Sequence, residues 1–405
     1  MPPTGSYVQF NQTVIRFEVD IPDEYVVENF FVSKLFEFIE FKLNHVAIQS
    51  KSSANDNIIS NFMQHRMNYA DGVFNNMGPL EGYWSTKSLN SSELYTLDQP
   101  ASPPDIGQTR RGHPEVSLRQ MGAYKNTVTG KWRYCFISKI NFPFAKTRHP
   151  LPRECPFQLI FHRATSNKSL LSVKLDSDGN DIGGFTEHSI PLLNPVLVLA
   201  LANSSYYDSK YSTHKLPRLN WPFTQNVVRR DTLLEGVAYH KVKISDGPLP
   251  SAICFSFMRP EAWEGSYTGT ITHFNPQNIE RFDLQLNAKS LPSYPLELNN
   301  FSAHNFFYHF NKTCNFWDNP LTLGGVNYES FINGNFIVVE DLKNKGYDDG
   351  QFCLSLKFKE VLPKNLLLVM LIIKQKTLQI DEFLNCSVHN LELSKADKEA
   401  EKLGS

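Results

Sequence analysis

A chain of 405 residues with 41% hydrophobic and 20% charged side chains can bury a sizeable core, and its composition argues against a disordered protein. This length allows two or three domains of about 100–200 residues each. Lys and Arg total 40 and Asp and Glu total 41, so the net charge of −1 gives no electrostatic reason to expect direct nucleic-acid binding, which needs a basic surface.

The residue usage also points to a fold class and an environment. Thirty Phe and sixteen Tyr, with 24 Pro and 21 Gly, favour strands joined by turns over helices. The six cysteines are scattered and form no CxxC pair. The N-terminal MPPTGSYVQF lacks the charged region and apolar stretch of a secretory signal. We therefore expect a soluble intracellular protein with reduced cysteines.

In the first half of the chain, strand patterns surround one helix. VIRFEVDI (14–21) and much of LFEFIEFKLNHVAI (35–48) alternate apolar and polar residues, as a half-buried strand does. The stretch 55–69 predicts a short helix that Asn55 can cap, and we expect it to close one end of a β structure. Its apolar residues at helical spacing are Ile58, Ile59, Phe62 and Met63.

Strand patterns resume after a long surface loop, rich in Pro, Gly and Ser, at 97–115. The stretch 170–185 predicts a hairpin with an Asp-Gly turn. PVLVLALA (195–202) is wholly apolar but too short to cross a bilayer, which needs about 20 residues. The other strands predicted in this region are 132–140 and 155–164.

A second series of strands follows a Tyr-, Ser-, Lys- and Pro-rich stretch near 205–220. It ends in GQFCLSLKFKEVLPKNLLLVMLIIKQKTLQID (350–381), where an alternating run precedes the unbroken apolar run Leu366–Ile373. The first run predicts a half-buried strand, and the second predicts a strand buried on both faces. The other strands predicted here are 238–245, 251–257, 271–287, 306–310 and 335–342.

About seven or eight strand patterns lie on each side of residue 215, which predicts an all-β fold of two sandwiches in tandem. The predicted division is an N-terminal arm at 1–13, a first unit at 14–215, a second unit at 216–390 and a charged tail at 391–405.

The order of these motifs resembles one protein family. PLPSAICFSFMRPEAWEGSYTGTITHFNPQNIERFDLQLNAKSLP, then YESFINGNFIVVEDL, then the stretch 350–381 look like the second jelly roll of the double jelly-roll major capsid proteins of the Polinton/Maverick–adintovirus group. FVSKLFEFIEFKLNHVAIQ and INFPFAKTRHPLPRECPFQLIFHRA, with Arg163 at the family's arginine, are similar to its first roll, so the resemblance covers roughly residues 7 to 388. The second-half positions that match are Pro250, Ala262, Gly265, His273, Phe274, Pro292, Gly350, Leu354, Phe358, Leu362, Ile380 and Asp381.

The resemblance implies two tandem eight-stranded jelly-roll β-sandwiches, a double jelly roll with a short helix in the first. It implies a structural protein, not an enzyme, with no cofactor, whose homotrimers form hexon-like, pseudo-hexameric capsomers of an icosahedral shell. The implied partners are other copies of the chain and penton or minor capsid proteins, without sequence-specific nucleic-acid binding and without a membrane span. The implied place is the virion capsid, assembled in the host nucleus or cytoplasm.

Two departures from the family leave the function of the loops open. The loops are shorter than the long tower insertions that members often carry. Lys374 and Lys376 stand where an aromatic or acidic residue is commoner.

Two rolls standing side by side would bury each other's flanking strands, which then lose their polar face. We expect Leu366–Ile373 and Val196–Ala202 to be such strands, covered by their own core on one side and by a neighbouring roll or subunit on the other. The residues predicted to build this core and interface are Phe352, Leu354, Leu356, Phe358, Leu366, Leu368, Met370 and Ile372.

One stretch offers ligands for a metal. Asp176, Asp178 and Asp181 in DSDGND could supply oxygen atoms to Ca²⁺, and Gly179 would allow the tight turn. The EF-hand pattern fails after this glycine, so a plain hairpin turn is the favoured interpretation.

Other chemistry-bearing residues are weaker candidates. His304 and His309 lie five apart, and on a strand this spacing would place them on opposite faces, which argues against a shared metal ion. Two dibasic pairs, Arg110-Arg111 and Arg229-Arg230, are expected to be solvated surface.

The alternative hypothesis is a two-sandwich carbohydrate-active or lectin-like protein. Its site would lie around Trp263 and Glu264 or around Trp317 and Asp318, although a core position is favoured for each Trp.

The two ends of the chain have open roles. The tail LELSKADKEAEKLGS (391–405) is predicted to be a frayed helix or disordered, and whether its Gly404 and Ser405 are native stays open. The tail or the N-terminal arm could instead clamp a neighbouring capsomer or an inner minor protein.

Overall fold

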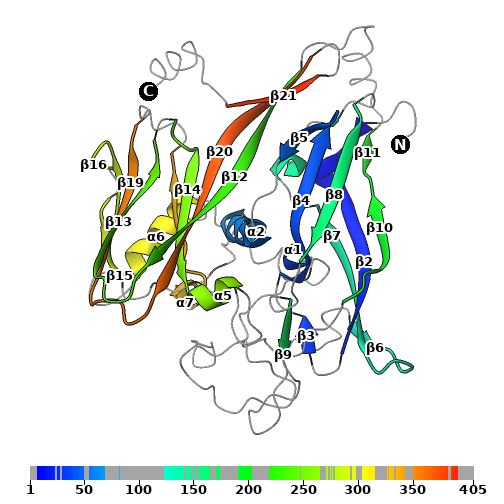
Figure 1. The fold of residues 1–405 in the computed structure, drawn as a ribbon, viewed down its shortest axis with the longest axis horizontal. Coiled ribbons are helices and arrows are strands. Elements are labelled where there is room, and N and C mark those ends of the chain that lie inside the picture. The colour runs from blue at the N-terminus through cyan, green and yellow to red at the C-terminus, as the bar shows by residue number, and fades with distance from the viewer. Residues whose placement is uncertain are drawn as a thin grey trace.

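The arrangement of helices and strands is shown in Figure 1, which draws a computed structural model of the whole chain. The residues described by this structure are 7–22, 25–27, 30–49, 54–68, 82, 123–140, 143–146, 150–151, 155–156, 157–164, 170–173, 190–202, 219–246, 248–264, 271, 274, 276, 279–291, 294–297, 303–314, 326, 328–332, 334–342, 350–381 and 385–390.

The second half of the chain folds into a sandwich of two antiparallel sheets. One sheet has the order β12 (Leu219–Leu233), β20 (Leu366–Ile380), β14 (Ala252–Met258) and β18 (Val338–Asp341), and β21 (Cys386–Asn390) pairs with β20. The other has the order β13 (Tyr239–Ser245), β19 (Phe352–Phe358), β15 (Ile279–Leu286) and β16 (Lys289–Ser290), and β17 (Leu296–Glu297) pairs with β15. Ring pairs join the sheets across one core, with centroids 5.3 Å apart for Phe255–Phe282 and 5.9 Å for Phe257–Phe358.

The first half forms a second sandwich from smaller sheets. One has the order β10 (Leu193–Val198), β2 (Val14–Ile21), β7 (Trp132–Lys139) and β6 (Ala123–Lys125), and another has the order β5 (Val46–Gln49), β4 (Phe36–Leu43) and β8 (Phe157–Arg163). Two short pairs are β1 (Tyr7–Val8) with β11 (Leu201–Ala202) and β3 (Tyr25–Val27) with β9 (Leu171–Val173). Phe17 of β2 and Phe36 of β4, 5.8 Å apart, join the two larger sheets through their core.

Helix α2 (Ala54–Asn68) lies between the two sandwiches (Figure 1). Its Phe62 and Met63 are buried in the core of the second half, although the helix belongs to the first half. The Phe62 ring lies 5.0 Å from that of Phe30 and 5.2 Å from that of Phe274. The predicted helix is confirmed, but its predicted place at one end of a β structure is wrong. The helix contacts β4 of the first half and β12 and β20 of the second, with its apolar residues in the second core.

The predicted cap of this helix is also wrong. Asn55 lies inside the first turn of α2, and its Nδ2 donates a hydrogen bond to the Trp263 carbonyl on α5 (Pro260–Glu264). The side chain therefore joins α2 to the second half of the chain.

Two long strands connect the cores. β12 and β20 pair over fifteen residues each, from Leu219 opposite Ile380 to Leu233 opposite Leu366. The C-terminal part of β12 and the N-terminal part of β20 belong to the second core. The start of β12 and the end of β20, which pair with each other, contribute residues to the first core. These end residues are Trp221, Phe223, Leu378 and Ile380.

Two further predictions of elements differ from the structure, and one long strand is missing from the predictions. The predicted strand 306–310 is part of helix α6 (His304–Thr313), because Phe306 and Phe310 lie one turn apart and are both buried on the same helix face. Strand β12 was not predicted, since Pro222 and a dibasic pair interrupt its apolar pattern. Within the predicted strand 271–287, the described strand is only β15.

The remaining short helices are α1 (Phe31–Leu35), α7 (Tyr328–Ile332), η1 (Phe10–Gln12) and η3 (Pro143–Lys146). None of the helices in the described ranges is long and apolar enough to cross a membrane.

Candidate functional site

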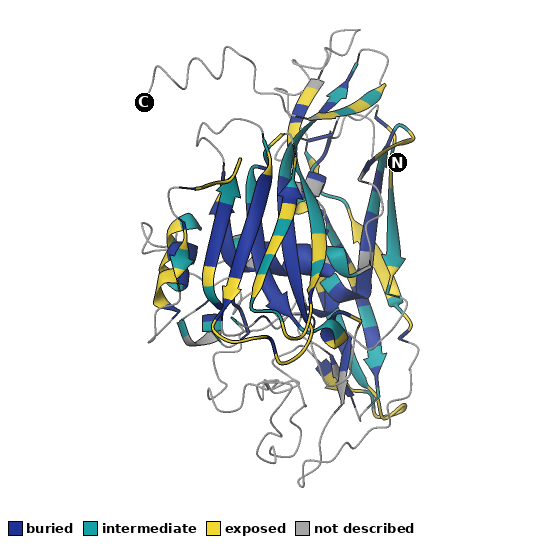
Figure 2. Ribbon diagram, turned by 60° about the vertical axis from the view of Figure 1, so that its left-hand side comes forward, coloured by how far each residue is buried: buried dark blue, intermediate teal, exposed yellow. Residues whose placement is uncertain are grey.

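Strand β20 is buried on both faces from Leu366 to Ile373. One face points into the second sandwich, since Leu368 and Met370 pair with Phe257 and Phe255, the residues whose rings reach the opposite sheet. Figure 2 shows the resulting dark-blue strands at the centre of the molecule.

The other face of β20 is covered by helix α2. Leu371 pairs with Cys254, whose Sγ lies 3.1 Å from Sδ of Met67 on α2. Ile373 pairs with Asn226, whose Nδ2 donates to Ser60 Oγ of α2 at 2.7 Å. Within one chain, the covering element is thus a helix from the first half. A role of this strand in contacts between copies stays a prediction.

Strand β19 is more buried than its alternating sequence predicts. Phe352, Leu354, Leu356 and Phe358 face the core as expected, but Ser355 is only 6% exposed on the opposite face. The reason is a bridge of side chains over β19: Lys241 of β13 donates its Nζ to Gln285 Oε1 of β15 at 3.1 Å. Lys357, beyond this bridge, is exposed and pairs with Glu280 at 2.8 Å.

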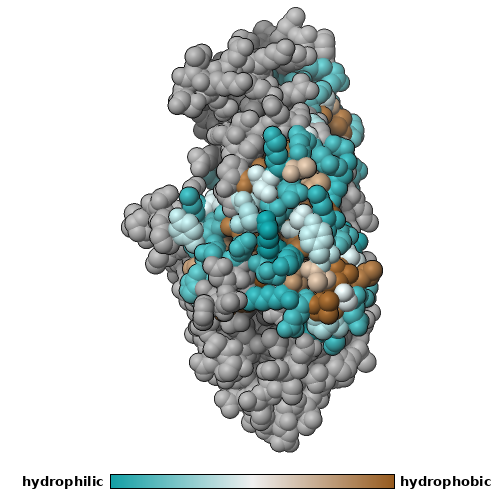
Figure 3. Space-filling view, turned by 90° about the vertical axis from the view of Figure 1, so that its left-hand side faces the viewer, coloured by the Kyte–Doolittle hydropathy of each residue, from teal (hydrophilic) through white to brown (hydrophobic). Residues whose placement is uncertain are grey.

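The outward face of the β13–β19–β15 sheet is polar. Figure 3, which views the molecule from that side, shows a largely hydrophilic surface with small hydrophobic areas. Lys243 of β13 pairs with Asp246 at 2.6 Å, and Arg281 of β15 is exposed opposite Lys357 of β19. Such a surface matches the solvated face expected of a sandwich.

The outermost strand of the first sandwich is apolar and exposed. On β10, Val196 and Val198 are each 49% accessible to solvent and Leu197 is 39% accessible, and Leu201 of the following strand β11 is 42% accessible. The neighbouring roll of the same chain therefore does not cover Val196–Ala202, and the predicted cover by a neighbouring subunit stays a prediction. The strand is at the edge of its sheet, on the side of the molecule away from the second sandwich (Figure 1).

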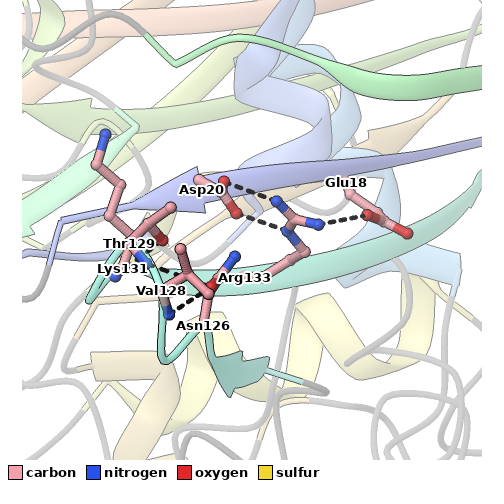
Figure 4. A network of polar contacts seen from close by, with 7 residues as sticks. All are labelled: Glu18, Asp20, Asn126, Val128, Thr129, Lys131 and Arg133. Carbon is pink, nitrogen blue, oxygen red and sulfur yellow. Dashed lines mark hydrogen bonds and ion pairs between the residues drawn. The ribbon is translucent and has the colours of Figure 1, made fainter.

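A polar cluster lies on the same sheet as β10. Arg133 of β7 donates through Nε and Nη2 to the two carboxylate oxygens of Asp20 at 2.7 and 2.9 Å, and its Nη1 lies 3.6 Å from Glu18 (Figure 4). These hydrogen bonds lower the pKa of the Asp20 carboxyl and raise that of the guanidinium. Asn126 closes the adjacent β6–β7 turn by accepting the Val128 amide at 3.0 Å.

A buried polar cluster lies at the second core. His309 of α6 lies with Nε2 2.9 Å from the Val339 carbonyl and 3.2 Å from Glu340 Oε2, and the Tyr294 hydroxyl donates to the same carboxylate oxygen at 3.2 Å. Burial, followed by the charge of Glu340, raises the pKa of Tyr294 well above its ordinary value, so this group stays a donor. The cluster connects α6 to β18 and satisfies its own polar atoms.

The other predicted site residues do not come together. His304 is exposed and stacks on Tyr328 at 4.2 Å, away from buried His309, and both lie on a helix instead of a strand. In the part of the chain that the structure describes, no group of three or more His, Cys, Asp or Glu residues could hold a metal ion. Asp176, Asp178, Asp181, Arg110, Arg111, Trp317 and Asp318 lie outside the described residues.

Among the described residues, Trp263 does not form the open site that the carbohydrate-binding alternative predicts. Trp263 is 6% exposed, and the Arg230 guanidinium covers its ring at 4.6 Å from the centroid. Arg229 donates through Nη1 to the Ile244 carbonyl, so both arginines of this dibasic pair have structural partners.

Comparison with solved structures identifies the fold. The chain is similar to one in a cryo-EM structure of the Sputnik virophage, with a TM-score of 0.62 and 13% identity over 98% of this chain and 85% of that one. It is similar to a chain of the PBCV-1 virus capsid (TM-score 0.56, 11% identity, 97% and 92% covered) and to the mavirus major capsid protein (0.51, 10%, 97% and 85%). No family profile matches the sequence, and no curated protein resembles it in sequence.

These neighbours are double jelly-roll capsid proteins, and the present chain has the same all-β double jelly-roll fold. The predicted fold class is confirmed. The likeness does not single out the Polinton/Maverick–adintovirus group among such proteins.

Proposed function

We propose that this chain is a major capsid protein whose homotrimers are the pseudo-hexameric capsomers of an icosahedral virus or virus-like shell. The likeness that supports this extends over 98% and 97% of the chain, so it involves both sandwiches. Its role is structural and not catalytic. The net charge of −1 suits a shell wall that leaves genome condensation to basic proteins.

The observation that carries the assembly step is the exposed apolar strand β10. Val196 pairs with Arg16, which pairs with Ile137 (37% exposed), so an apolar row with one charge crosses the outward sheet face. The Arg133–Asp20 cluster borders this row on the same sheet. An apolar centre with a polar rim is the usual composition of a protein–protein interface.

A second copy of the chain is the occupant that we propose for this surface. Burying a half-exposed Val or Leu contributes about 1 kcal/mol, so several such residues stabilise each contact by a few kcal/mol. Identical chains that contact through two different surfaces form a closed ring if the rotation closes. Three copies of a two-roll chain would then present six rolls around one axis.

The finer parts of the proposal follow the sequence. The two rolls span 14–215 and 216–390, and the tail 391–405 contacts neighbouring capsomers or minor capsid proteins. Of the predicted arm 1–13, only the residues before Tyr7 are proposed for such a contact, because Tyr7, Val8 and Phe10 are buried in the first roll. Penton or minor capsid proteins complete the shell in the host nucleus or cytoplasm. The order of the motifs supports placing the protein in the Polinton/Maverick–adintovirus group. The eight predicted core residues between Phe352 and Ile372 stabilise the roll that forms the capsomer wall.

The test is the mass of the protein in solution. We expect a homotrimer by light scattering, and shells or hexagonal arrays by electron microscopy at high concentration. Val196→Asp should give a folded monomer, because a carboxylate at the centre of the contact would be desolvated without a partner. The loss of several kcal/mol corresponds to a dissociation constant raised by orders of magnitude.

Val361→Asp is the matched control. Val361 is 58% exposed, but it lies in the turn between β19 and β20 and not on the β10 face. This variant should remain a trimer. A wild-type monomer that binds glycans would contradict the capsid proposal, and a Val196→Asp variant that remains trimeric would contradict the assigned surface.

A further inference from the structure

Two cysteines from distant parts of the chain meet at the end of the molecule where β21 lies. Cys155 precedes β8 and is 3% exposed in the first core, and Cys386 is the first residue of β21 and packs against the same core. Their side chains are hydrogen-bonded to each other, although roughly 230 residues separate them in sequence. Both are thiols in this structure.

The backbone around each cysteine is held in place. The carbonyl of Pro156 accepts the Asn44 amide at 2.8 Å, which fixes the segment of Cys155 against the β4–β5 turn. Cys386 pairs with Ile380 at the far end of β20. Figure 1 shows β21 directly above β5, so the two segments lie together at one end of the molecule.

The two thiols differ in their access to reagents. Cys386 is partly buried, whereas Cys155 is buried. The hydrogen bond with Cys155 lowers the pKa of the Cys386 thiol. Since the thiolate is the nucleophile in thiol chemistry, Cys386 is the more reactive of the two.

A second pair of nearby cysteines lacks these properties. Burial raises the pKa of Cys254 well above its ordinary value and that of Cys314 to about 12. Cys254 is in contact with Met67 inside the second core. These two thiols should therefore be inert under conditions in which Cys386 reacts.

We propose that Cys386 and Cys155 form a reversible disulfide that fastens the last strand, β21, to the first roll. The oxidant is a small-molecule disulfide such as glutathione disulfide. The Cys386 thiolate attacks one of its sulfur atoms, a mixed disulfide forms, and the first glutathione leaves as a thiolate. Cys155 gives its proton to the solvent and attacks the Cys386 sulfur, which releases the second glutathione. Two cysteines are oxidised and one glutathione disulfide is reduced to two thiols.

The bond would close a loop that contains most of the second roll. Closing a long loop restricts the unfolded chain, so the oxidised protein should be more resistant to heat than the reduced one. A reducing cytosol would keep the bond open, and an oxidising medium would allow it to close. This inference does not depend on the proposed function, because it needs only one folded chain.

The experiment uses the full chain in glutathione buffers of graded ratio, quenched by alkylation. Of the six thiols in the sequence, two should be lost, and a non-reducing digest should contain one cross-linked peptide that joins Cys155 to Cys386. The melting temperature should rise on oxidation and return to its first value after reduction.

Variants separate the two roles. Cys155→Ser should accumulate a mixed disulfide with glutathione at Cys386, whereas Cys386→Ser should leave Cys155 unmodified. Cys314→Ser is the control and should still form the bond. The proposal is overturned if wild-type protein in excess glutathione disulfide keeps all its thiols, or if the digest joins a different pair. This wild-type readout needs no variant to fold.

Discussion

Phe62→Ala tests whether helix α2 supports both sandwiches. The ring of Phe62 is 1% exposed and packs against Phe30 and Phe274, and the Arg66 guanidinium lies 5.3 Å from its centroid. Truncating a buried Phe costs about 3–5 kcal/mol, and the lost ring pairs place this site near the upper value. For a domain of roughly 200 residues, each kcal/mol lowers the melting temperature by about 2–4 °C. We therefore expect a decrease of about 10–20 °C.

Differential scanning calorimetry with near-UV circular dichroism measures this decrease. Because Phe30 belongs to the first half and Phe274 to the second, every transition of the thermogram should move to lower temperature. Tyr239→Ala removes an aromatic side chain that is 60% exposed on β13, and it should leave the thermogram unchanged. A Phe62→Ala protein that melts like this control would refute the packing of α2 between the sandwiches.

Two further predictions concern the second core and the charged face of the first roll. Leu368→Asp or Met370→Asp places a carboxylate inside the second sandwich and should abolish the proposed soluble trimers in size-exclusion chromatography. Lys357→Ala loses only an exposed ion pair and should be tolerated. A soluble Leu368→Asp trimer would contradict the burial of β20 in the second sandwich. Asp20→Asn should lower the free energy of unfolding at pH 7 by about 1 kcal/mol. Arg133 lowers the folded pKa of Asp20 below the ordinary value of 3.8, so the wild type has its full advantage in stability above that pH. The advantage is lost as the pH falls through the folded pKa, and urea titrations at the lowest pH should find none. A difference between the two proteins that persists there would have another origin.

The parts of the fold that the sequence predicts best are strands whose two faces differ. β2 spans the predicted 14–21, because its residues alternate between the two faces. The core residues are Ile15, Phe17, Val19 and Ile21, and the outward residues include Arg16, Glu18 and Asp20. β12 escapes the same reasoning. Its Arg229 and Arg230 are exposed, as the sequence predicts, and they also contact a backbone carbonyl and the Trp263 ring. β12 is a strand because it pairs with β20, which lies far along the chain, and the local sequence pattern of β12 does not contain this information.

Helix α6 fails for a related reason. Its aromatic residues favour a strand by residue type, while the interval between Phe306 and Phe310 fits one helical turn equally well. The helix is favoured because the second core buries both rings. His309 of the same helix also lies within 2.9 Å of the Val339 carbonyl and 3.2 Å of the Glu340 carboxylate. A short aromatic segment can satisfy either periodicity until its neighbours are known.

The two wholly apolar runs show what composition alone leaves undecided. Leu366–Ile373 and Val196–Ala202 both predict strands that need cover on two sides, yet only the first is covered within the chain, by α2. In the part of the chain that is described, β10 keeps its apolar side chains exposed at a sheet edge. An apolar edge strand left open invites uncontrolled pairing with other chains. The proposed contact with another copy would remove this hazard, so the exposed strand supports the proposed assembly.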